Sequence, residues 1–137
     1  MQVEHVLETC LYVDDLTAAE HFYKNILGLK LMSKVEGRHV FFRCERQVFL
    51  LFKADETQKG GDLPPHGSHG SGHIAFAIKS ETLPQWIEHL TAHKVDIEKE
   101  MAWGERGKSI YFRDPAGNSV ELATPRIWSI DESDIFN

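Results

Sequence analysis

The chain has 137 residues, of which 42% are hydrophobic and 26% are charged, and it carries a formal net charge of −6 at pH 7. This length corresponds to about one domain, and the composition is that of an ordinary globular protein, which excludes the disordered and membrane classes. No apolar run approaches the roughly 20 residues that cross a bilayer, and the first residues lack the basic start of a secretory signal, so we expect a cytoplasmic protein. Because no basic cluster is present, we expect a small-molecule partner, with no nucleic acid and no membrane.

The first part of the chain has the pattern of one helix and four strands. Residues 8–13 alternate between apolar and polar types and predict a strand. Apolar residues three and four apart over residues 16–27 predict a helix of about 12 residues, with aspartates before it and Gly28 after it. Three more strands are predicted at residues 29–35, 39–44 and 47–53.

Residues 54–72 are rich in Gly, Pro, His and Ser and indicate a linker or a long loop. The first pattern then starts again. Residues 73–78 match the first strand at an offset of 65, a helix follows with Leu83, Trp86, Ile87 and Leu90 toward the core, and strands are predicted at 95–99, 109–113 and 119–124. We therefore predict an internal duplication. Unit one spans about 3–53 and unit two 73–125, within a single domain of residues 1–137 that ends in a tail of residues 126–137.

This duplication brings together three residues with metal-binding chemistry. Glu8 and His73 open the first strands of the two units, and Glu121 lies inside the last strand between apolar neighbours. Burying such a carboxylate costs several kcal/mol unless it is paired, protonated or bound to a cation. One histidine and two carboxylates would make a divalent metal site with open positions. The plain alternatives are a hydrogen-bonded His73, an exposed Glu8 and a Glu121 that faces a lysine.

Several motifs resemble the vicinal oxygen chelate superfamily, which includes glyoxalase I, fosfomycin-resistance thiol transferases, bleomycin-resistance proteins and extradiol dioxygenases. The resemblance covers about residues 3–125. It rests on Glu8-x6-Asp15-Leu16, Phe22-Tyr23, Leu27-Gly28-Leu29, Gly72-His73-Ile74-Ala75-Phe76 and the hairpin sequence Tyr111-Phe112-Arg113-Asp114-Pro115-Ala116-Gly117-Asn118 with Glu121-Leu122.

What the resemblance implies is an α+β fold of two tandem βαβββ units, which form a curved mixed sheet around a central cavity. It also implies a homodimer and one divalent ion, held by Glu8, His73 and Glu121, that binds vicinal oxygens of the substrate. Glu8 stands where most enzymatic members carry histidine, which favours harder ions; Zn, Mn, Fe, Ni and Mg are all candidates. The fourth ligand of glyoxalase I aligns near Phe49 or Leu50, neither of which binds metal, so glyoxalase I itself is not expected.

Four further residues are candidates for the site. Arg43 would bind an anionic substrate oxygen or form a surface ion pair. His66 and His69 would form a lid or supply an acid-base group, or simply belong to a flexible linker. Trp103 would wall the substrate pocket or close the core. Trp128, in the tail, is interpreted as a packing residue, with the acidic residues after it solvated.

Taken together, these features predict a metal-dependent lyase, isomerase or transferase in which the ion neutralises a developing oxyanion and Glu8 or Glu121 acts as the base. The rival hypothesis is a bleomycin-resistance-type binding protein without catalysis, since an acidic chain suits a cationic ligand. An extradiol dioxygenase ranks lower because it needs two histidines and only His73 matches.

Overall fold

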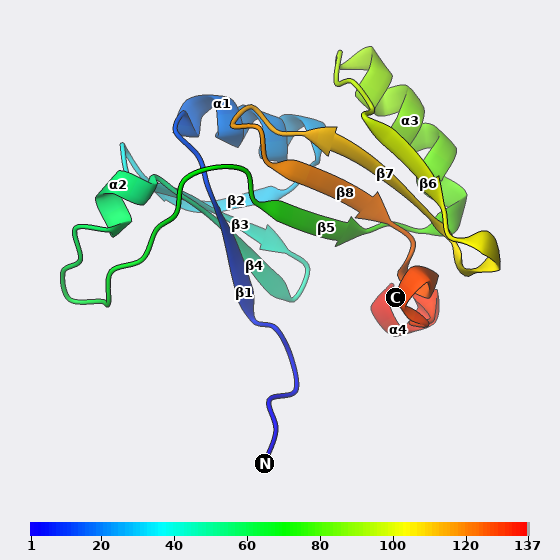
Figure 1. The fold of residues 1–137 in the computed structure, drawn as a ribbon, viewed down its shortest axis with the longest axis horizontal. Helices are drawn as coiled ribbons and strands as arrows, with labels where there is room; N and C mark the ends of the chain where they lie inside the picture. Colours follow the sequence, from blue (N-terminus) through cyan, green and yellow to red (C-terminus); the bar gives the residue numbers. More distant parts are fainter. Residues whose placement is uncertain (137) are drawn as a thin grey trace. The chain divides into compact units, whose positions relative to one another are not determined.

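The computed structural model describes residues 1–136, which divide into two compact units: residues 1–72, and the chain from His73 onward. Each unit contains a four-stranded mixed sheet, and the two sheets have the same strand order (Figure 1). The predicted α+β class with tandem βαβββ units is confirmed. The single domain stays a prediction. Among the described residues, none of the helices has the length and apolar character that crossing a membrane requires.

Unit 1 has the strand order β1-β4-β3-β2, with β1 parallel to β4 and the other pairs antiparallel. The element bounds are β1 Glu8–Tyr12, α1 Leu16–His21, the π-helix η1 Phe22–Ile26, β2 Lys30–Val35, β3 His39–Cys44 and β4 Gln47–Phe52. The helix predicted over residues 16–27 therefore changes from α to π after His21. Asp15 caps its start, accepting a hydrogen bond from the Ala18 N–H at 3.0 Å.

The core of unit 1 lies between α1, η1 and one face of the sheet. Tyr23 is fully buried, and its ring centroid lies 4.9 Å from that of Phe49 and 6.1 Å from that of Phe42. Because side chains alternate along a strand, the other face of the sheet carries Glu8 and Tyr12 of β1. This period of two explains why the strands were predictable from the apolar pattern.

A short helix, α2 (Ala54–Thr57), begins the segment that was predicted as a linker. The rest of the segment, up to Gly72, contains turns and extended chain. The segment folds back on α2, since the His66 N–H donates to the Thr57 carbonyl at 3.2 Å.

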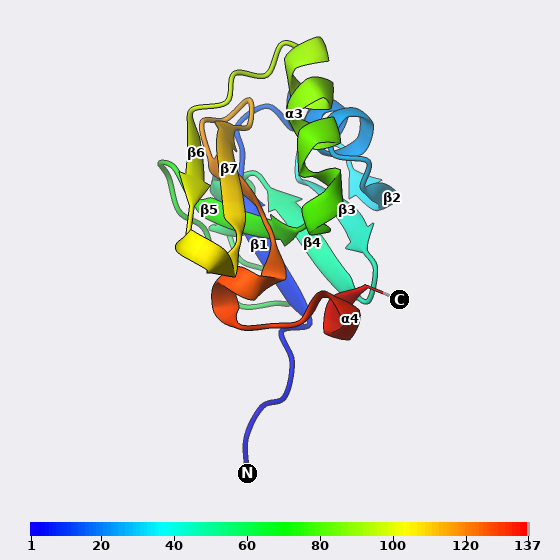
Figure 2. The ribbon, with the colours of Figure 1, turned by 90° about the vertical axis from the view of Figure 1, so that its right-hand side faces the viewer.

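Unit 2 has the order β5-β8-β7-β6, and β5 is parallel to β8. The bounds are β5 His73–Ala77, the 3₁₀ helix η2 Ser80–Thr82, α3 Leu83–Ala92, β6 Lys99–Ala102, the 3₁₀ helix η3 Gly104–Arg106, β7 Lys108–Arg113, β8 Ser119–Ala123, the 3₁₀ helix η4 Pro125–Trp128 and α4 Glu132–Ile135. In Figure 2, α3 forms a layer beside β6 and β7, and Leu90 of this helix is fully buried. The strand predicted at residues 95–99 was misplaced, since β6 begins at Lys99.

The C-terminal tail differs from its prediction. Trp128 is 77% exposed, so its interpretation as a packing residue was wrong. Glu132 is not simply solvated either: one of its carboxylate oxygens accepts hydrogen bonds from the Ser80 N–H, at 2.8 Å, and from the Ser80 hydroxyl. The last residue of the predicted tail, Asn137, lies outside the described residues.

Candidate metal centre

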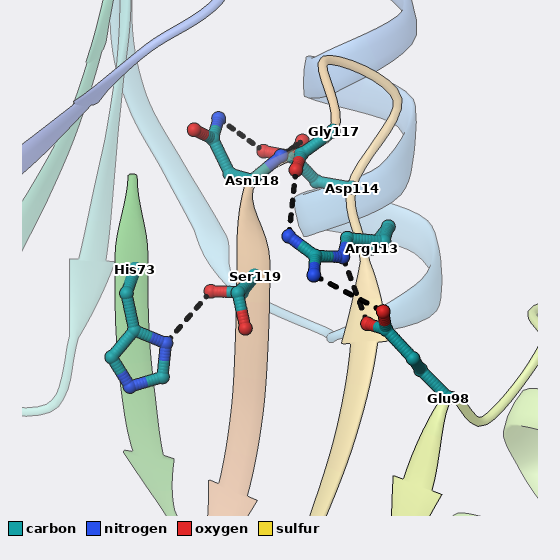
Figure 3. A network of polar contacts seen from close by, with 7 residues as sticks. All are labelled: His73, Glu98, Arg113, Asp114, Gly117, Asn118 and Ser119. Atoms are coloured by element: carbon teal, nitrogen blue, oxygen red, sulfur yellow. Dashed lines mark hydrogen bonds and ion pairs between the residues drawn. The ribbon is translucent and has the colours of Figure 1, made fainter. Parts of the chain in front are cut away.

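The hairpin between β7 and β8 positions Glu121. Its turn is organised by Asp114, which is 4% exposed. One oxygen of this carboxylate accepts the backbone N–H groups of Ala116 and Asn118, each at 2.9 Å. The other oxygen accepts the Asn118 side-chain amide, also at 2.9 Å (Figure 3). Gly117 has a φ of 86°, which favours glycine. This turn fixes the register in which Tyr111 lies opposite Glu121.

A second polar contact braces the same turn from the side of β7. Arg113 binds the Glu98 carboxylate through Nε at 2.8 Å and Nη2 at 3.1 Å, and its Nη1 donates to the Gly117 carbonyl at 3.1 Å (Figure 3). The hydrogen bond from Arg113 lowers the pKa of Glu98, and the pKa of Arg113 is raised in turn. Both side chains are exposed, so the contact contributes orientation more than stability.

Glu121 is buried, with 6% of its surface exposed, and it faces His73 across the parallel pair β5 and β8. His73 Nε2 lies 3.3 Å from Glu121 Oε2. The His73 side chain is about half exposed, at 52%, so the pair is open to solvent on the histidine side. The two predicted ligands of unit 2 are therefore brought together.

The ring of His73 is oriented by the main chain. Its Nδ1 lies 3.1 Å from the Ser119 carbonyl oxygen (Figure 3), and because a carbonyl only accepts, Nδ1 carries the proton. In the neutral imidazole, Nε2 then presents a lone pair to the Glu121 carboxylate. Two acceptors at this distance require a cation between them, either a proton or a metal ion. Histidine residues that bind a metal ion typically donate their other ring N–H to an acceptor such as this carbonyl.

The donor set fits a divalent ion. An imidazole nitrogen and a carboxylate oxygen suit Zn, Mn or Fe, and two ligands each about 2.0–2.2 Å from one ion lie about 3.0–3.5 Å apart. The separation of 3.3 Å falls in this range. In the described part of unit 2, no third His, Cys, Asp or Glu completes a group of three around the pair.

Two residues beside Glu121 were missed from the sequence. Tyr111 lies opposite Glu121 in the antiparallel pair, and burial, followed by the neighbouring Glu121 carboxylate, raises the pKa of its phenol, against a smaller lowering by Ser109. Ser109 is fully buried and accepts the Trp103 indole N–H at 3.0 Å. Ser109 and Tyr111 lie two residues apart in β7, so both point to the same face of the sheet as Glu121, and the hairpin register would have identified them. Trp103 was predicted either to wall the substrate pocket or to close the core. It is half-buried, and its indole N–H is hydrogen-bonded to Ser109 of β7.

In unit 1, Glu8 is exposed at the first position of β1, the place that His73 holds in β5. Glu8 and Arg43 both pair with Val48, and Arg43 is exposed. The register places Leu50 where unit 2 has Glu121, and Phe41 where unit 2 has Tyr111. This specifies Leu50, rather than Phe49, as the position without a ligand.

His66 contacts the same face of unit 1. Its Nδ1 lies 2.6 Å from the Tyr12 hydroxyl, and its ring centroid is 4.9 Å from that of Phe52. Burial is the main cause of a raised pKa at the Tyr12 phenol. His69 lies 3.1 Å from Asp55, an exposed contact at α2. The two histidines therefore have different partners: His66 contacts Tyr12 and Phe52, and His69 contacts Asp55.

Comparison with known proteins decides the family. The model of the Glyoxalase/Bleomycin resistance protein/Dioxygenase superfamily matches residues 2–122. The chain belongs to this superfamily. The resemblance stated from the sequence motifs is confirmed, and the most specific of those motifs, the turn around Asp114, is the one that positions Glu121.

Relatives within the superfamily have several described activities. The chain is 33% identical to a metallothiol transferase FosB of Staphylococcus epidermidis over 125 residues, 90% of this chain and 84% of the relative. A lactoylglutathione lyase structure from Agrobacterium tumefaciens is 36% identical, with a TM-score of 0.90 over 95% of this chain and all of that chain. The fosfomycin resistance protein FosX of Listeria monocytogenes, solved with Mn(II) and sulfate, is 25% identical, with a TM-score of 0.66 over 90% of this chain and 91% of that chain.

Proposed function

We propose that the protein is a divalent-metal-dependent transferase or lyase that acts on a small oxygenated substrate. The observation that carries the proposal is the His73–Glu121 pair, in which two metal-ligand atoms lie 3.3 Å apart and the second imidazole nitrogen is held by a carbonyl. The relatives support a metalloenzyme, since one is named a metallothiol transferase, one a lyase, and one was solved with Mn(II).

Glu8 is proposed as the third ligand. It occupies the position of unit 1 equivalent to His73, and its exposed carboxylate offers the hard oxygen that such an ion takes. The bound ion would act as a Lewis acid that polarises the oxygens of the substrate. Glu121 is buried and oriented and would hold its place, whereas the exposed Glu8 is free to reorient and to accept a proton from the substrate.

The proposed substrate is small and anionic. Arg43 supports this class because an exposed guanidinium on the same strand row as Glu8 can bind a carboxylate or phosphonate through two N–H groups. His66 and Trp103 remain proposed contacts at the edges of the site. We also propose a homodimer in the cytoplasm, and light scattering of the purified protein measures that oligomeric state.

The test is metal binding by the purified chain. Elemental analysis and titration with Zn²⁺ and Mn²⁺ alone should give one ion per chain for the wild type. His73→Ala and Glu121→Gln should weaken binding by at least 100-fold, because the first removes the ligand nitrogen and the second removes the negative charge of the carboxylate. Glu100→Gln is the matched control, since it makes the same chemical change at an exposed strand position of unit 2 and should leave the affinity unchanged.

A folded wild type that binds no divalent ion would overturn the proposal and favour the ligand-binding alternative. Metal binding that survives both His73→Ala and Glu121→Gln would place the ion elsewhere. Where binding is found, assays of thiol transfer and of lyase activity with the loaded protein separate the two reaction classes.

A further inference from the structure

The C-terminal end of α3 carries two histidines that lie one helical turn apart. His89 is in the last turn of the helix and His93 is its capping residue, and residues at this spacing of four lie on the same face. Their ring centroids are 4.3 Å apart, with 46° between the ring planes. His89 is half-buried and His93 is exposed, so ions in solution can reach the pair. Neither residue belongs to the candidate metal centre of His73 and Glu121.

The ring of His93 is oriented by the main chain. Its backbone N–H donates to the His89 carbonyl at 3.1 Å, and its side-chain Nδ1 lies 2.8 Å from the same oxygen. Because a carbonyl only accepts, Nδ1 carries the proton, and in the neutral imidazole Nε2 then carries the lone pair. Histidines that bind a metal ion are typically held in this way, with the second ring nitrogen bonded to an acceptor.

The helix end that carries the two rings is itself fixed. Leu90, the residue after His89, is fully buried, and its carbonyl accepts the Val95 N–H at 2.9 Å. The Lys94 N–H donates to the Thr91 carbonyl at 3.0 Å, and Lys94 has a φ of 58°, a left-handed conformation that ends the helix. The backbone beneath the pair is therefore already ordered before any ion binds.

The separation of the rings indicates which ions fit. A ligand nitrogen lies about 2.0 Å from its ion and its ring centroid about 1.2 Å farther away, so two imidazoles at a right angle have centroids about 4.5 Å apart, and tetrahedral ones about 5.2 Å. The value of 4.3 Å in α3 is closer to the right-angled arrangement. Tetragonal sites with nitrogen ligands are typical of Cu²⁺ and Ni²⁺, whereas Mn²⁺ prefers oxygen.

We propose that His89 and His93 form a second metal site, which binds one Cu²⁺ or Ni²⁺ ion through two imidazole nitrogens. This inference does not depend on the proposed function, because it uses other residues and another class of ion. Among the residues that the structure describes, no third His, Cys, Asp or Glu joins the pair in a group that could hold an ion. The remaining positions of the ion are therefore left to water or to a small ligand.

The experiment titrates Cu²⁺ into His73→Ala, a variant in which the other candidate centre lacks one ligand. Binding is followed by the quenching of tryptophan fluorescence, because the Trp86 indole stands edge-on to His89 with ring centroids 5.6 Å apart. One equivalent of Cu²⁺ should saturate the quenching. Adding His93→Asn should weaken binding about 100-fold, because a single imidazole loses the advantage of two linked ligands. The asparagine amide still offers a donor to the His89 carbonyl, so the circular dichroism spectrum should not change.

His21→Ala is the matched control. His21 is an exposed helix histidine whose neighbour four residues on is Asn25, with Nδ2 of Asn25 2.8 Å from Nδ1 of His21. It therefore has the same spacing without a second imidazole, and its removal should leave the Cu²⁺ affinity unchanged. Trp86→Phe should abolish the fluorescence response, while the electron paramagnetic resonance spectrum of bound Cu²⁺ still shows two nitrogen ligands.

Equal Cu²⁺ affinity with and without His93→Asn would overturn this inference, and so would a resonance spectrum with a single nitrogen ligand. Mn²⁺ binding by the wild type tests the proposed function separately, since His93→Asn should leave it unchanged. A chain that binds Cu²⁺ at α3 and no Mn²⁺ would therefore keep the second site and count against the first.

Discussion

Asp114 shows how one buried side chain determines the geometry of the site. It accepts three hydrogen bonds from the four residues that follow it, and two of these come from the backbone. Because the turn sets the pairing of β7 with β8, the same carboxylate sets which residue faces Glu121. Asp114 therefore affects the position of the proposed metal ligand Glu121, several residues away in the sequence.

Asp114→Ala should lower the free energy of unfolding by roughly 3 kcal/mol, since it leaves buried donors without an acceptor. Urea denaturation measures this change. Asp131→Ala is the control, because Asp131 also accepts a backbone N–H, from Ser133, but at an exposed position in the tail. It should cost less than about 1 kcal/mol. Equal losses for the two variants would contradict the role assigned to Asp114.

Residue-level prediction from the sequence worked where burial followed from the strand pattern. Glu121 was identified because a carboxylate between two apolar strand residues is unusual, and it is indeed buried. Tyr111 was missed because an aromatic residue in a strand normally needs no functional explanation. The interpretation of Trp128 as a packing residue was wrong for a similar reason. The size of its side chain favours burial, but it stands at the end of a 3₁₀ helix and is exposed.

At the scale of elements, the prediction depended on how apolar residues are spaced. The central strands β3, β4, β7 and β8 bury residues on at least one face, so their positions followed from the sequence within one residue. The edge strand β6 is exposed along its whole length and has no apolar alternation, which is why it was placed four residues too early. The π-helix η1, which follows α1, was not predicted, because the apolar pattern was analysed for a helix of 3.6 residues per turn.

The contact between α4 and η2 gives a prediction with a defined pH dependence. Hydrogen bonds from Ser80 are the main cause of a lowered pKa at Glu132. A carboxyl whose pKa is lower in the folded state than in the unfolded state stabilises the fold above its unfolded pKa, and this stabilisation is lost as the pH falls through the folded value.

Glu132→Gln should therefore reduce the melting temperature at pH 7 and make little difference at pH 3. The effect should be small, because the side chain is only partly buried and solvent screens the interaction. Thermal unfolding at the two pH values measures it, with Glu105→Gln, an exposed substitution in η3, as the control. A larger effect of Glu132→Gln at pH 3 than at pH 7 would contradict the assignment.

At the scale of the whole molecule, the order of elements and the candidate residues Glu8, His73 and Glu121 were predicted from the sequence, and the contacts that orient these residues were not. Strand order and parallel pairing are the same in both sheets. The residues at equivalent positions differ, with Glu8 and Leu50 in unit 1 and His73 and Glu121 in unit 2. Sequence periodicity predicts the strands and helices that the two units share, because it reflects which residues are buried. The hydrogen-bond partners of Glu121 depend on register and side-chain orientation, which periodicity does not report.

Metal binding should also stabilise the whole chain. An ion that binds the folded state alone raises the free energy of unfolding by about 2.7 kcal/mol at a free concentration 100 times its dissociation constant. The melting temperature of the wild type should rise with added Mn²⁺ and return to its starting value with a chelator. His73→Ala should show no such rise. An equal rise in His73→Ala would mean that the stabilising ion binds at another site.

The contact between His73 and the Ser119 carbonyl has a consequence for how the sequence can vary. The acceptor belongs to the main chain, so every residue type at position 119 provides it, and the parallel pairing of β5 with β8 is sufficient to orient the imidazole. Homologous chains can therefore differ at this position without any effect on the ring. An orienting interaction of this kind does not require a conserved side chain at position 119, so it is recognised from the three-dimensional structure.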